Sequence, residues 1–233
     1  FPTFYAVYKK DKVAYSLGVN PIGGGGSADF KSGLPSFEQQ IAVLPGLLLL
    51  NGLTDPDHLA YSVKSAFNGN SLNWGFQFNA SYALTDMISL SLGFRYVISN
   101  NNYEGYLKDV MINPFHPYNP NGAGSMVSAP LFFGALSTAA TGAATSMQGI
   151  IDGGGGGFTL AQLVGAGYIT QNQADQLSGG LGANYDPNWT ADQVQGAYYA
   201  NAEAMNGYAE MTSDKEVDAS QTSSGISPII GVN

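Results

Sequence analysis

The chain has 233 residues, a formal net charge of −9 and only 11% charged residues, against about 25% in a typical globular protein. Its eight Lys and Arg are spread along the whole length, so no basic cluster can neutralise several nucleic-acid phosphates, and no nucleic-acid partner is expected. The sequence has no cysteine, which excludes disulfides, thiolate metal sites and thiol nucleophiles.

Neither a transmembrane helix nor a signal peptide is expected. The longest apolar stretch, residues 41–50, is interrupted by Pro45 and Gly46 and falls short of the roughly 20 apolar residues that a membrane-spanning helix needs. The first three residues, Phe1-Pro2-Thr3, lack the basic and apolar regions of a signal peptide.

Residues 1–20 are predicted to form a first β-hairpin. Apolar side chains recur there at odd positions, the period of a strand with one apolar face. They are Tyr5, Val7, Val13, Tyr15, Leu17 and Val19. Because both runs share odd parity, the turn between them must contain an odd number of residues. We expect a three-residue turn, Lys10-Asp11-Lys12, with Val7 opposite Tyr15.

Residues 21–71 are predicted to form a long loop that contains a short helix. The strand before it ends at Asn20-Pro21 and a run of four glycines, residues 23–26, where proline and glycine stop the ladder and let the backbone bend. No Lys-Ser or Lys-Thr pair follows the glycines, so a phosphate-binding loop is not indicated. Leu59, Val63 and Phe67 have helical spacing, which predicts the helix over residues 55–67.

Residues 72–108 are predicted to form a second, longer hairpin. Its apolar residues lie at even positions on both sides of the turn: Trp74, Phe76, Phe78, Ala80, Tyr82, Leu84, Ile88, Leu90, Leu92, Phe94, Tyr96 and Ile98. The same parity argument leaves residues 85–87 as a three-residue turn and puts Leu84 opposite Ile88 and Phe78 opposite Phe94. Since this turn has no glycine, Asp86 is expected to adopt the left-handed backbone conformation.

The length and polarity of the second hairpin indicate the fold class. Each run has about a dozen residues and spans roughly 40 Å, whereas strands of soluble domains usually have about 5 or 6 residues. A tilted strand of that length crosses a bilayer. The opposite face carries Asn, Gln, Ser, Gly and a single Arg95, which suits the lumen of a barrel. We therefore predict an all-β transmembrane antiparallel β-barrel with long, partly helical extracellular loops; a hairpin of a soluble β-sandwich is the alternative.

Residues 109–227 are predicted to form a long extracellular helical subdomain, and residues 228–233 to begin the next strand. Thr159, Thr170 and Thr190 each begin a Thr-x-x-Gln sequence, the spacing of a helix capping box. The four long strands are fewer than the eight that a single-chain barrel needs. We therefore expect the chain to be part of a larger barrel; several copies closing one barrel are the alternative.

No catalytic, metal or cofactor site is predicted. Asp55, Asp57 and His58 could suggest metal binding or acid–base chemistry, but Asp beside Pro in a loop more often caps a helix. His116 lies between Phe115 and Pro117 with no partner nearby in the sequence. An outer-membrane lipase or protease would need a Ser-His-Asp set or its equivalent, and the two histidines do not indicate one.

The order of elements resembles the FadL/TodX-type outer-membrane transporters of fatty acids and aromatic hydrocarbons, in the form found in Bacteroidetes-like bacteria. The resemblance is carried by residues 5–12, by the strand that ends in residues 20–26, by the strand pair over residues 73–96 and by the very long outer segment. It implies a monomeric barrel of fourteen strands with an N-terminal hatch, in the bacterial outer membrane. It also implies that the hydrophobic ligand leaves laterally through a kink in the third strand, which corresponds here to Asn20, Pro21 and Gly23.

The implied function is passive uptake of hydrophobic molecules, either long-chain fatty acids or aromatic hydrocarbons, past the hydrated lipopolysaccharide layer and into membrane lipid. Exposed apolar residues in the outer loops would collect the ligand in a shallow groove. The candidates are Leu47, Leu48, Leu50, Leu131, Phe132 and Phe133; they could equally form the core of the loops. The other functions considered are a structural or adhesive surface barrel and a polar porin.

Overall fold

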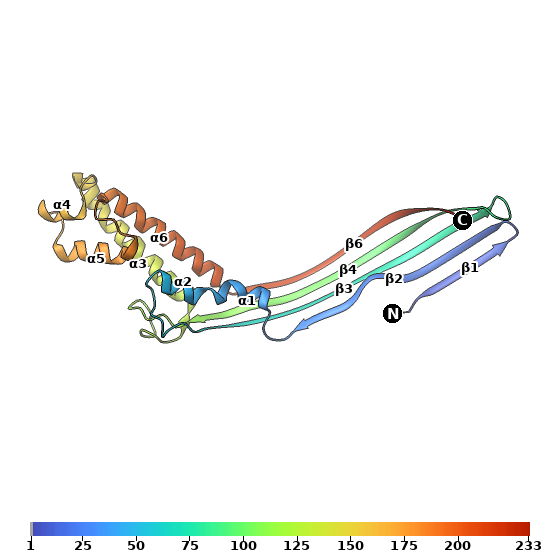
Figure 1. Cartoon of the computed structure of the whole chain (residues 1–233), viewed down its shortest axis with the longest axis horizontal. Coiled ribbons are helices and arrows are strands. Elements are labelled where there is room, and N and C mark those ends of the chain that lie inside the picture. The colour runs from blue at the N-terminus through green and yellow to red at the C-terminus, as the bar shows by residue number, and fades with distance from the viewer. Residues whose placement is uncertain (1) are drawn as a thin grey trace. The chain divides into compact units, whose positions relative to one another are not determined.

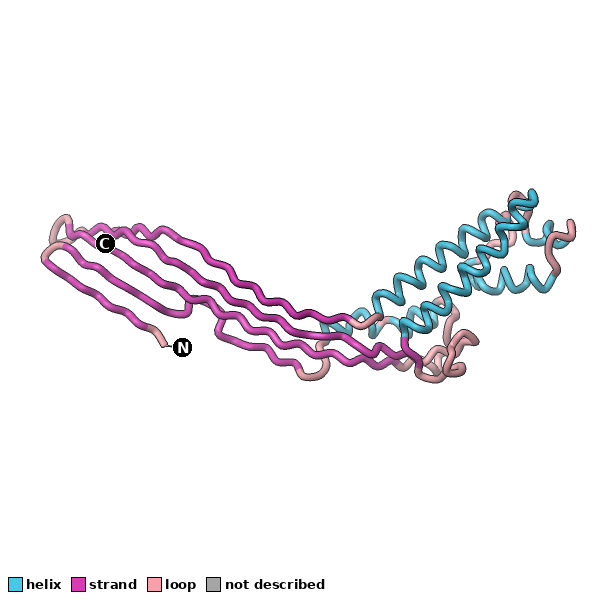
Figure 2. The backbone as a smooth tube through the Cα atoms, turned by 180° about the vertical axis from the view of Figure 1, so that it is seen from behind, coloured by secondary structure: helices cyan, strands magenta, loops and turns pink. Residues whose placement is uncertain are grey.

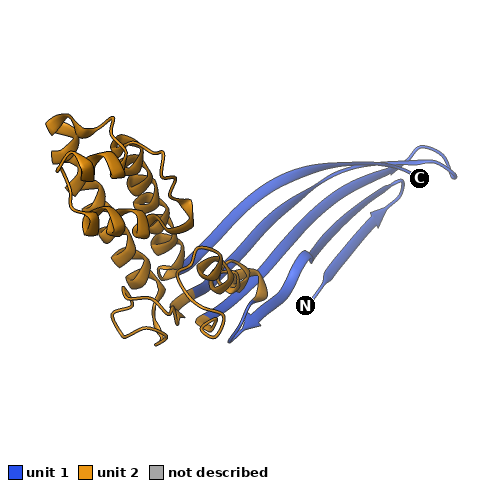
Figure 3. Ribbon diagram, turned by 60° about the vertical axis from the view of Figure 1, so that its left-hand side comes forward, with its two compact units in different colours: residues 1–34, 65–106, 216–233 blue, residues 35–64, 107–215 orange. Residues whose placement is uncertain are grey.

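The computed structural model describes residues 2–233, and the chain divides into two compact units (Figure 3). We call residues 1–34, 65–106 and 216–233 the sheet unit, and residues 35–64 and 107–215 the helical unit. Each unit is built from segments that are distant in the sequence, because the chain leaves the sheet twice and returns to it.

The sheet is antiparallel and contains five long strands and one short one (Figures 1 and 2). The strands are β1 (Phe4–Lys10), β2 (Val13–Phe30), β3 (Tyr61–Ala83), β4 (Ser89–Ile112), β5 (Val127–Ser128) and β6 (Lys215–Val232). They pair in the order β1-β2-β3-β4, and β4 also pairs with β5 and with β6. The predicted β-rich, antiparallel architecture is confirmed, and within residues 2–233 the sheet is open, with β1 and β6 as its outer long strands.

The register of the second hairpin is confirmed. The Leu84 N–H donates to the Ile88 carbonyl at 2.9 Å, and the rings of Phe78 and Phe94 lie 6.2 Å apart. The prediction for Asp86 is wrong, because among the described residues other than glycine only Asp11 and Asp109 have positive φ. The Thr85 hydroxyl stabilises this turn instead, accepting hydrogen bonds from the Met87 and Ile88 N–H groups at 3.2 and 3.0 Å.

The register of the first hairpin differs from the prediction by one residue. Lys10 pairs with Val13, so the turn has two residues and Val7 lies opposite Ser16 rather than Tyr15. Asp11 opens this turn with φ 54°, as the first residue of a primed hairpin turn does. The parity argument failed because residues 4–8 of β1 are apolar at both odd and even positions, so burial of one face does not fix the register.

The loop between β2 and β3 is shorter than predicted. β2 runs on to Phe30 and pairs there with Phe67, so residues 61–67 are a strand and the helix predicted over residues 55–67 is wrong. Those residues also alternate with period two, and pairing with β2 decides between the two patterns. The connection between β2 and β3 instead contains two helices, α1 (Pro35–Ala42) and α2 (Leu44–Leu50). They include the apolar stretch that precedes the predicted helix.

The helical unit confirms the three capping boxes. Thr159, Thr170 and Thr190 are the N-caps of α4 (Leu160–Gly165), α5 (Gln171–Leu181) and α6 (Ala191–Thr212), each with reciprocal hydrogen bonds to the Gln three residues later. The remaining elements are α3 (Ala129–Ile150), a π-helical turn η1 (Ile151–Gly155) and a 3-10 turn η2 (Gly182–Asn184). The strand predicted to begin at residue 228 begins at Lys215. Its first residues carry no apolar alternation, so the sequence pattern did not reveal them.

Two hydrophobic cores stabilise the helical unit. One packs α1 and α2 against the first part of α3 and includes Ile41, Leu44, Phe132 and Phe133; the other joins the far end of α3 to α4, α5 and α6. Among the described residues, no helix is long and apolar enough to cross a membrane.

Candidate functional site

One face of the sheet unit is lined with exposed and partly exposed apolar side chains, which we call the apolar band. Its members are Phe4, Ala6, Tyr8, Val13, Tyr15, Leu17, Val19, Trp74, Phe76, Phe78, Ala80, Tyr82, Leu84, Ile88, Leu90, Leu92, Phe94, Tyr96, Ile98, Ile226, Ile230 and Val232. The pairing of β1 with β2 and of β2 with β3 puts their members on one face. Ile230 of β6 lines the same shallow depression as Ala80 and Leu92, so the band continues across β4 to β6.

Within the sheet unit, no described residue covers the band. All of the buried hydrophobic side chains among residues 2–233 belong to the helical unit. On the inner strands, Phe78 and Phe94 are 40% and 45% exposed, while Phe4 on β1 and Ile230 on β6 are 58% and 80% exposed. An uncovered apolar face of this extent is typical of a surface that contacts a membrane, another protein or a ligand. The greater exposure at β1 and β6 reflects a neighbouring strand on one side only.

The height of the band can be worked out from β3 and β4. From Trp74 beside Ile98 to Leu84 beside Ile88 the strands advance about ten residues, which is roughly 34 Å along each strand at 3.4 Å per residue. A tilt of about 35–45°, as in membrane barrels, reduces this to about 24–28 Å, and the apolar band of such barrels is about 25 Å tall.

The same face turns polar beyond the band. In the next rows, Asn70, Asn102 and Ser220 are linked across three strands, with Asn102 donating to Asn70 at 3.4 Å and Ser220 donating to Asn102 at 2.8 Å. Thr222 likewise donates to Asn100 at 3.0 Å. The last apolar residue of this face before these polar rows is Leu72 on β3, Ile98 on β4 and Ile226 on β6, so the border of the band lies within about two rows on the three strands.

We call the opposite face of the sheet unit the polar face, formed by the odd residues of β3 and β4 and by the residues of β1, β2 and β6 that share their side. Arg95 donates through Nε and Nη2 to the Gln77 Oε1 atom at 3.0 and 2.5 Å. Three further side-chain hydrogen bonds join neighbouring strands: Ser99 donates to Asn73, Ser71 to Asn101 at 2.6 Å, and Asn79 to Ser16 at 3.3 Å. On β3 and β4 this face therefore carries neutral hydrogen-bonding groups around the single Arg95.

The β2 ladder is irregular at the residues predicted to form the kink. Two register shifts occur, between Pro21 and Gly23 and between Gly24 and Gly26. Gly24 has φ +72°, and an added Cβ would meet the backbone of β3, so a side chain is disfavoured there. β1 pairs with β2 only as far as Val19. Within residues 2–233, β2 from Asn20 onward therefore pairs with β3 alone.

Three of the six residues predicted to line a ligand groove in the loops are buried in the fold. Leu48, Phe132 and Phe133 are 4%, 0% and 2% exposed and belong to the first core of the helical unit. Their assignment as ligand-binding residues is therefore corrected: they stabilise the fold. The other three candidates are surface residues, Leu47 partly buried and Leu50 and Leu131 exposed.

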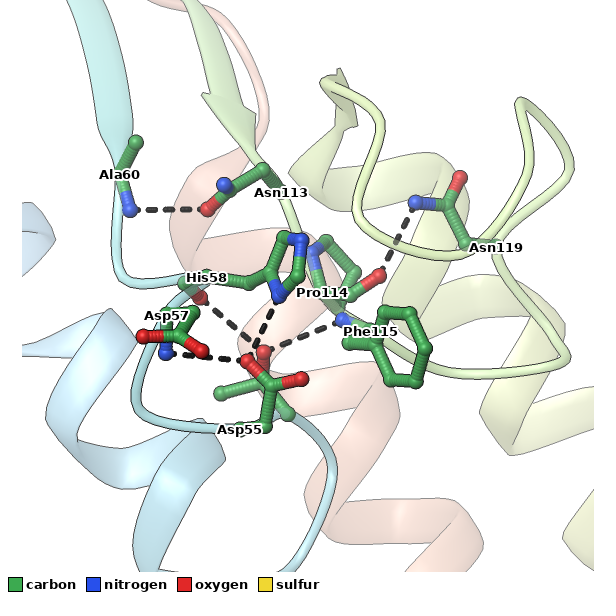
Figure 4. Close-up of polar contacts among 9 residues, drawn as sticks. Asp55, Asp57, His58, Ala60, Asn113, Pro114, Phe115 and Asn119 are labelled. Carbon is green, nitrogen blue, oxygen red and sulfur yellow. Dashed lines mark hydrogen bonds and ion pairs between the residues drawn. The ribbon is translucent and has the colours of Figure 1, made fainter.

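Two loops of the helical unit meet around His58 (Figure 4). His58 Nδ1 lies 2.6 Å from Asp55 Oδ1, and its ring stacks on Phe115 with the centroids 5.0 Å apart. The Thr54 hydroxyl donates to the His58 carbonyl at 3.0 Å and accepts from the Phe115 N–H at 3.1 Å. These contacts tie the loop before β3 to the loop after β4.

The titratable groups of these loops have structural partners. The hydrogen bond from His58 lowers the pKa of Asp55, which also accepts from the Asp57 N–H at 3.0 Å and caps no helix. Burial lowers the pKa of His116, whose ring stacks with Tyr118 at 5.5 Å. Among the described residues, no group of three His, Asp or Glu side chains is arranged to hold a metal ion.

Comparison of the chain with models of protein families, with curated proteins and with solved structures gives no match.

Proposed function

We propose that this chain forms part of the wall of a transmembrane β-barrel in a bacterial outer membrane, and that the barrel takes up hydrophobic molecules passively. The observation that carries the proposal is the apolar band, because its height fits the hydrocarbon layer and no described residue of the sheet unit covers it. Lipid acyl chains would cover the band, and the polar face would line the lumen.

The two outer long strands support closure with further strands. β1 and β6 each expose one row of backbone N–H and C=O groups, and such groups cannot stay unpaired in hydrocarbon, so a membrane sheet must close. A soluble β-sandwich would need a second β-sheet over the band, and the described residues of the sheet unit form one sheet. The proposed assembly is a monomeric barrel of about fourteen strands, of which this chain contributes five long ones.

The irregular part of β2 is the proposed exit for the ligand. Its two bulges interrupt the ladder close to Trp74, at the border of the apolar band. An apolar molecule leaving the lumen there would enter the lipid without crossing the lipopolysaccharide headgroups. No catalytic step is proposed, because binding and diffusion are sufficient for this function. The ligand class is long-chain fatty acids or aromatic hydrocarbons.

Uptake of naphthalene by cells that express the full protein tests the proposal. Gly26 lies at the second bulge with open space around an added Cβ, so Gly26→Phe should obstruct the exit without straining the fold. Gly225 on β6 also has open space around an added Cβ, and Gly225→Phe is the matched control. We expect Gly26→Phe to reduce uptake several-fold and the control to leave it unchanged. Equal uptake by the two variants and the parent, at equal surface expression, would contradict the lateral route.

An adhesive or structural barrel is distinguished by the same experiment. Such a barrel would give no naphthalene uptake above that of cells without the protein, although the chain would be inserted in the membrane.

A further inference from the structure

The acidic residues in the strands of the sheet unit all lie on one of its two faces. Four acidic residues lie within its strands, and all four share the side of the apolar band, beyond its border: Asp29, Glu104, Glu216 and Asp218. Asp29 is placed there by its pairing with Asn68, and the acidic residues of β6 by the even register that joins Ser220 to Asn102. The other two acidic residues of the unit, Asp11 and Asp86, lie in turns.

Within the sheet unit, the polar face of the described strands therefore carries two basic side chains and no carboxylate, whereas Lys10, which pairs with Val13, lies on the side of the apolar band. Arg95 lies near its middle, and Lys9 lies near the first turn, where it pairs with Ala14. This distribution is opposite to the overall composition, since the whole chain has a net charge of −9. In a closed barrel, the part of the lumen that this wall forms would attract anions.

The Arg95 guanidinium has N–H donors left with which to bind a further group. It is the single arginine of the chain, is partly buried, and forms no ion pair among residues 2–233. Its Nε and Nη2 atoms both donate to one acceptor atom, Gln77 Oε1. A guanidinium has five N–H donors in a rigid planar arrangement, so Gln77 fixes its orientation and leaves other donors for a ligand.

The surroundings of Arg95 suit an anion that is attached to an apolar group. The Ile22 side chain is directed over Gly75, whose added Cβ would also come within 3.5 Å of the Arg95 Cδ atom. On β1 and β2, the Tyr5 ring lies over Gly18 in the same way. Glycines therefore admit apolar side chains next to the one arginine of this face.

We propose that Arg95, oriented by Gln77, forms a subsite for the anionic group of an amphipathic ligand, of the carboxylate, sulfonate or phosphate type. This inference rests on the proposed function in one respect, that the polar face lines the ligand passage. It adds a residue that distinguishes anionic from neutral hydrophobic molecules.

Binding of two probes of equal chain length to the full protein in lipid nanodiscs tests the subsite. The probes are 1-decanesulfonate and 1-decanol, measured by calorimetry with empty nanodiscs subtracted. Charge-assisted hydrogen bonds contribute enough for a preference of about tenfold or more. We expect the parent protein to prefer the sulfonate by that ratio, Arg95→Gln to abolish the preference, and Arg95→Lys to retain part of it. Lys9→Gln is the matched control for charge on the same face, and it should keep the preference.

The outcomes separate the subsite from the proposed function. Decanol binding with no sulfonate preference, or a preference unchanged in Arg95→Gln, would overturn the subsite and leave hydrophobic uptake standing. Sulfonate binding that depends on Arg95 without any decanol binding would support the subsite and count against uptake of neutral molecules. If neither probe binds the parent protein, both proposals are overturned. Should Arg95→Gln fail to insert, a weaker sulfonate preference in Arg95→Lys gives the same test.

Discussion

A charged side chain in the middle of the apolar band distinguishes a lipid-facing sheet from a water-facing one. Leu92 lies near the middle of the band on β4 and is 66% exposed, so an arginine there meets no steric obstacle. If lipid covers the band, Leu92→Arg should cost about 2–4 kcal/mol of folding free energy, because this is the cost of Arg on the lipid face at the bilayer midplane.

The same substitution at the border of the band is the internal control. Ile98 lies beside Trp74, at the level where the face becomes polar, and Ile98→Arg should cost only about 0–1 kcal/mol because Arg there reaches the interface. Unfolding by guanidinium in lipid vesicles, followed by fluorescence of the two tryptophans, gives both values. In water, substitutions at exposed positions usually change stability by less than about 0.5 kcal/mol. Equal and small changes in folding free energy at the two positions would therefore show that lipid does not cover the band.

Three further predictions concern single contacts. Gly93→Ala should lower stability and barrel yield because the added Cβ would overlap the Asn79 side chain. Gly225→Ala is the control, since an added Cβ there meets open space. Equal heat resistance of the two variants on gels would contradict the predicted overlap. Thr190→Ala removes the α6 capping box and should cost about 1 kcal/mol, measured as a lower melting temperature of the helical signal by circular dichroism, and an unchanged temperature would count against it. The hydrogen bond to His58 lowers the pKa of Asp55 in the folded protein. The ionised Asp55 carboxylate therefore stabilises the fold at pH values above the ordinary carboxyl pKa, and this stabilisation is lost as pH falls through the lowered pKa of the folded state. Asp55→Asn should remove this part of the acid sensitivity, and identical acid unfolding curves of variant and parent would show that the pair contributes nothing.

Sequence patterns predicted the structure correctly where only one strong pattern was present. The β3–β4 register followed from the shared even parity of their apolar residues, and the capping boxes at Thr159, Thr170 and Thr190 followed from local hydrogen-bonding chemistry. Both signals depend on residues close in the sequence, so long-range packing did not alter them.

Where two patterns competed, the sequence alone could not decide. Residues 4–8 are apolar at both parities, so the geometry of the two-residue turn at Asp11 set the register of β1. Residues 61–67 fit a helix and a strand equally, and pairing with β2 selected the strand. For Phe132 and Phe133, an apolar loop sequence does not indicate whether the side chains bind a ligand or each other; the structure buries them. The separation of charge around Arg95 required the registers of β2 and β6, which no local pattern gives.

The proposal that the apolar band faces lipid is tested most directly by measuring whether each residue of β4 contacts lipid or water in the membrane. Because the chain has no cysteine, single cysteines at positions 88–104 can each carry a nitroxide, whose collisions with oxygen report lipid and whose collisions with a water-soluble nickel chelate report water. If the apolar band faces lipid and the polar face lines the lumen, oxygen access should be high at even positions from 88 to 98 and greatest near residues 92–94. Access to the nickel chelate should be high at odd positions and beyond residue 100. Water access at the even positions, or no alternation along the strand, would contradict the proposal that the apolar band faces lipid.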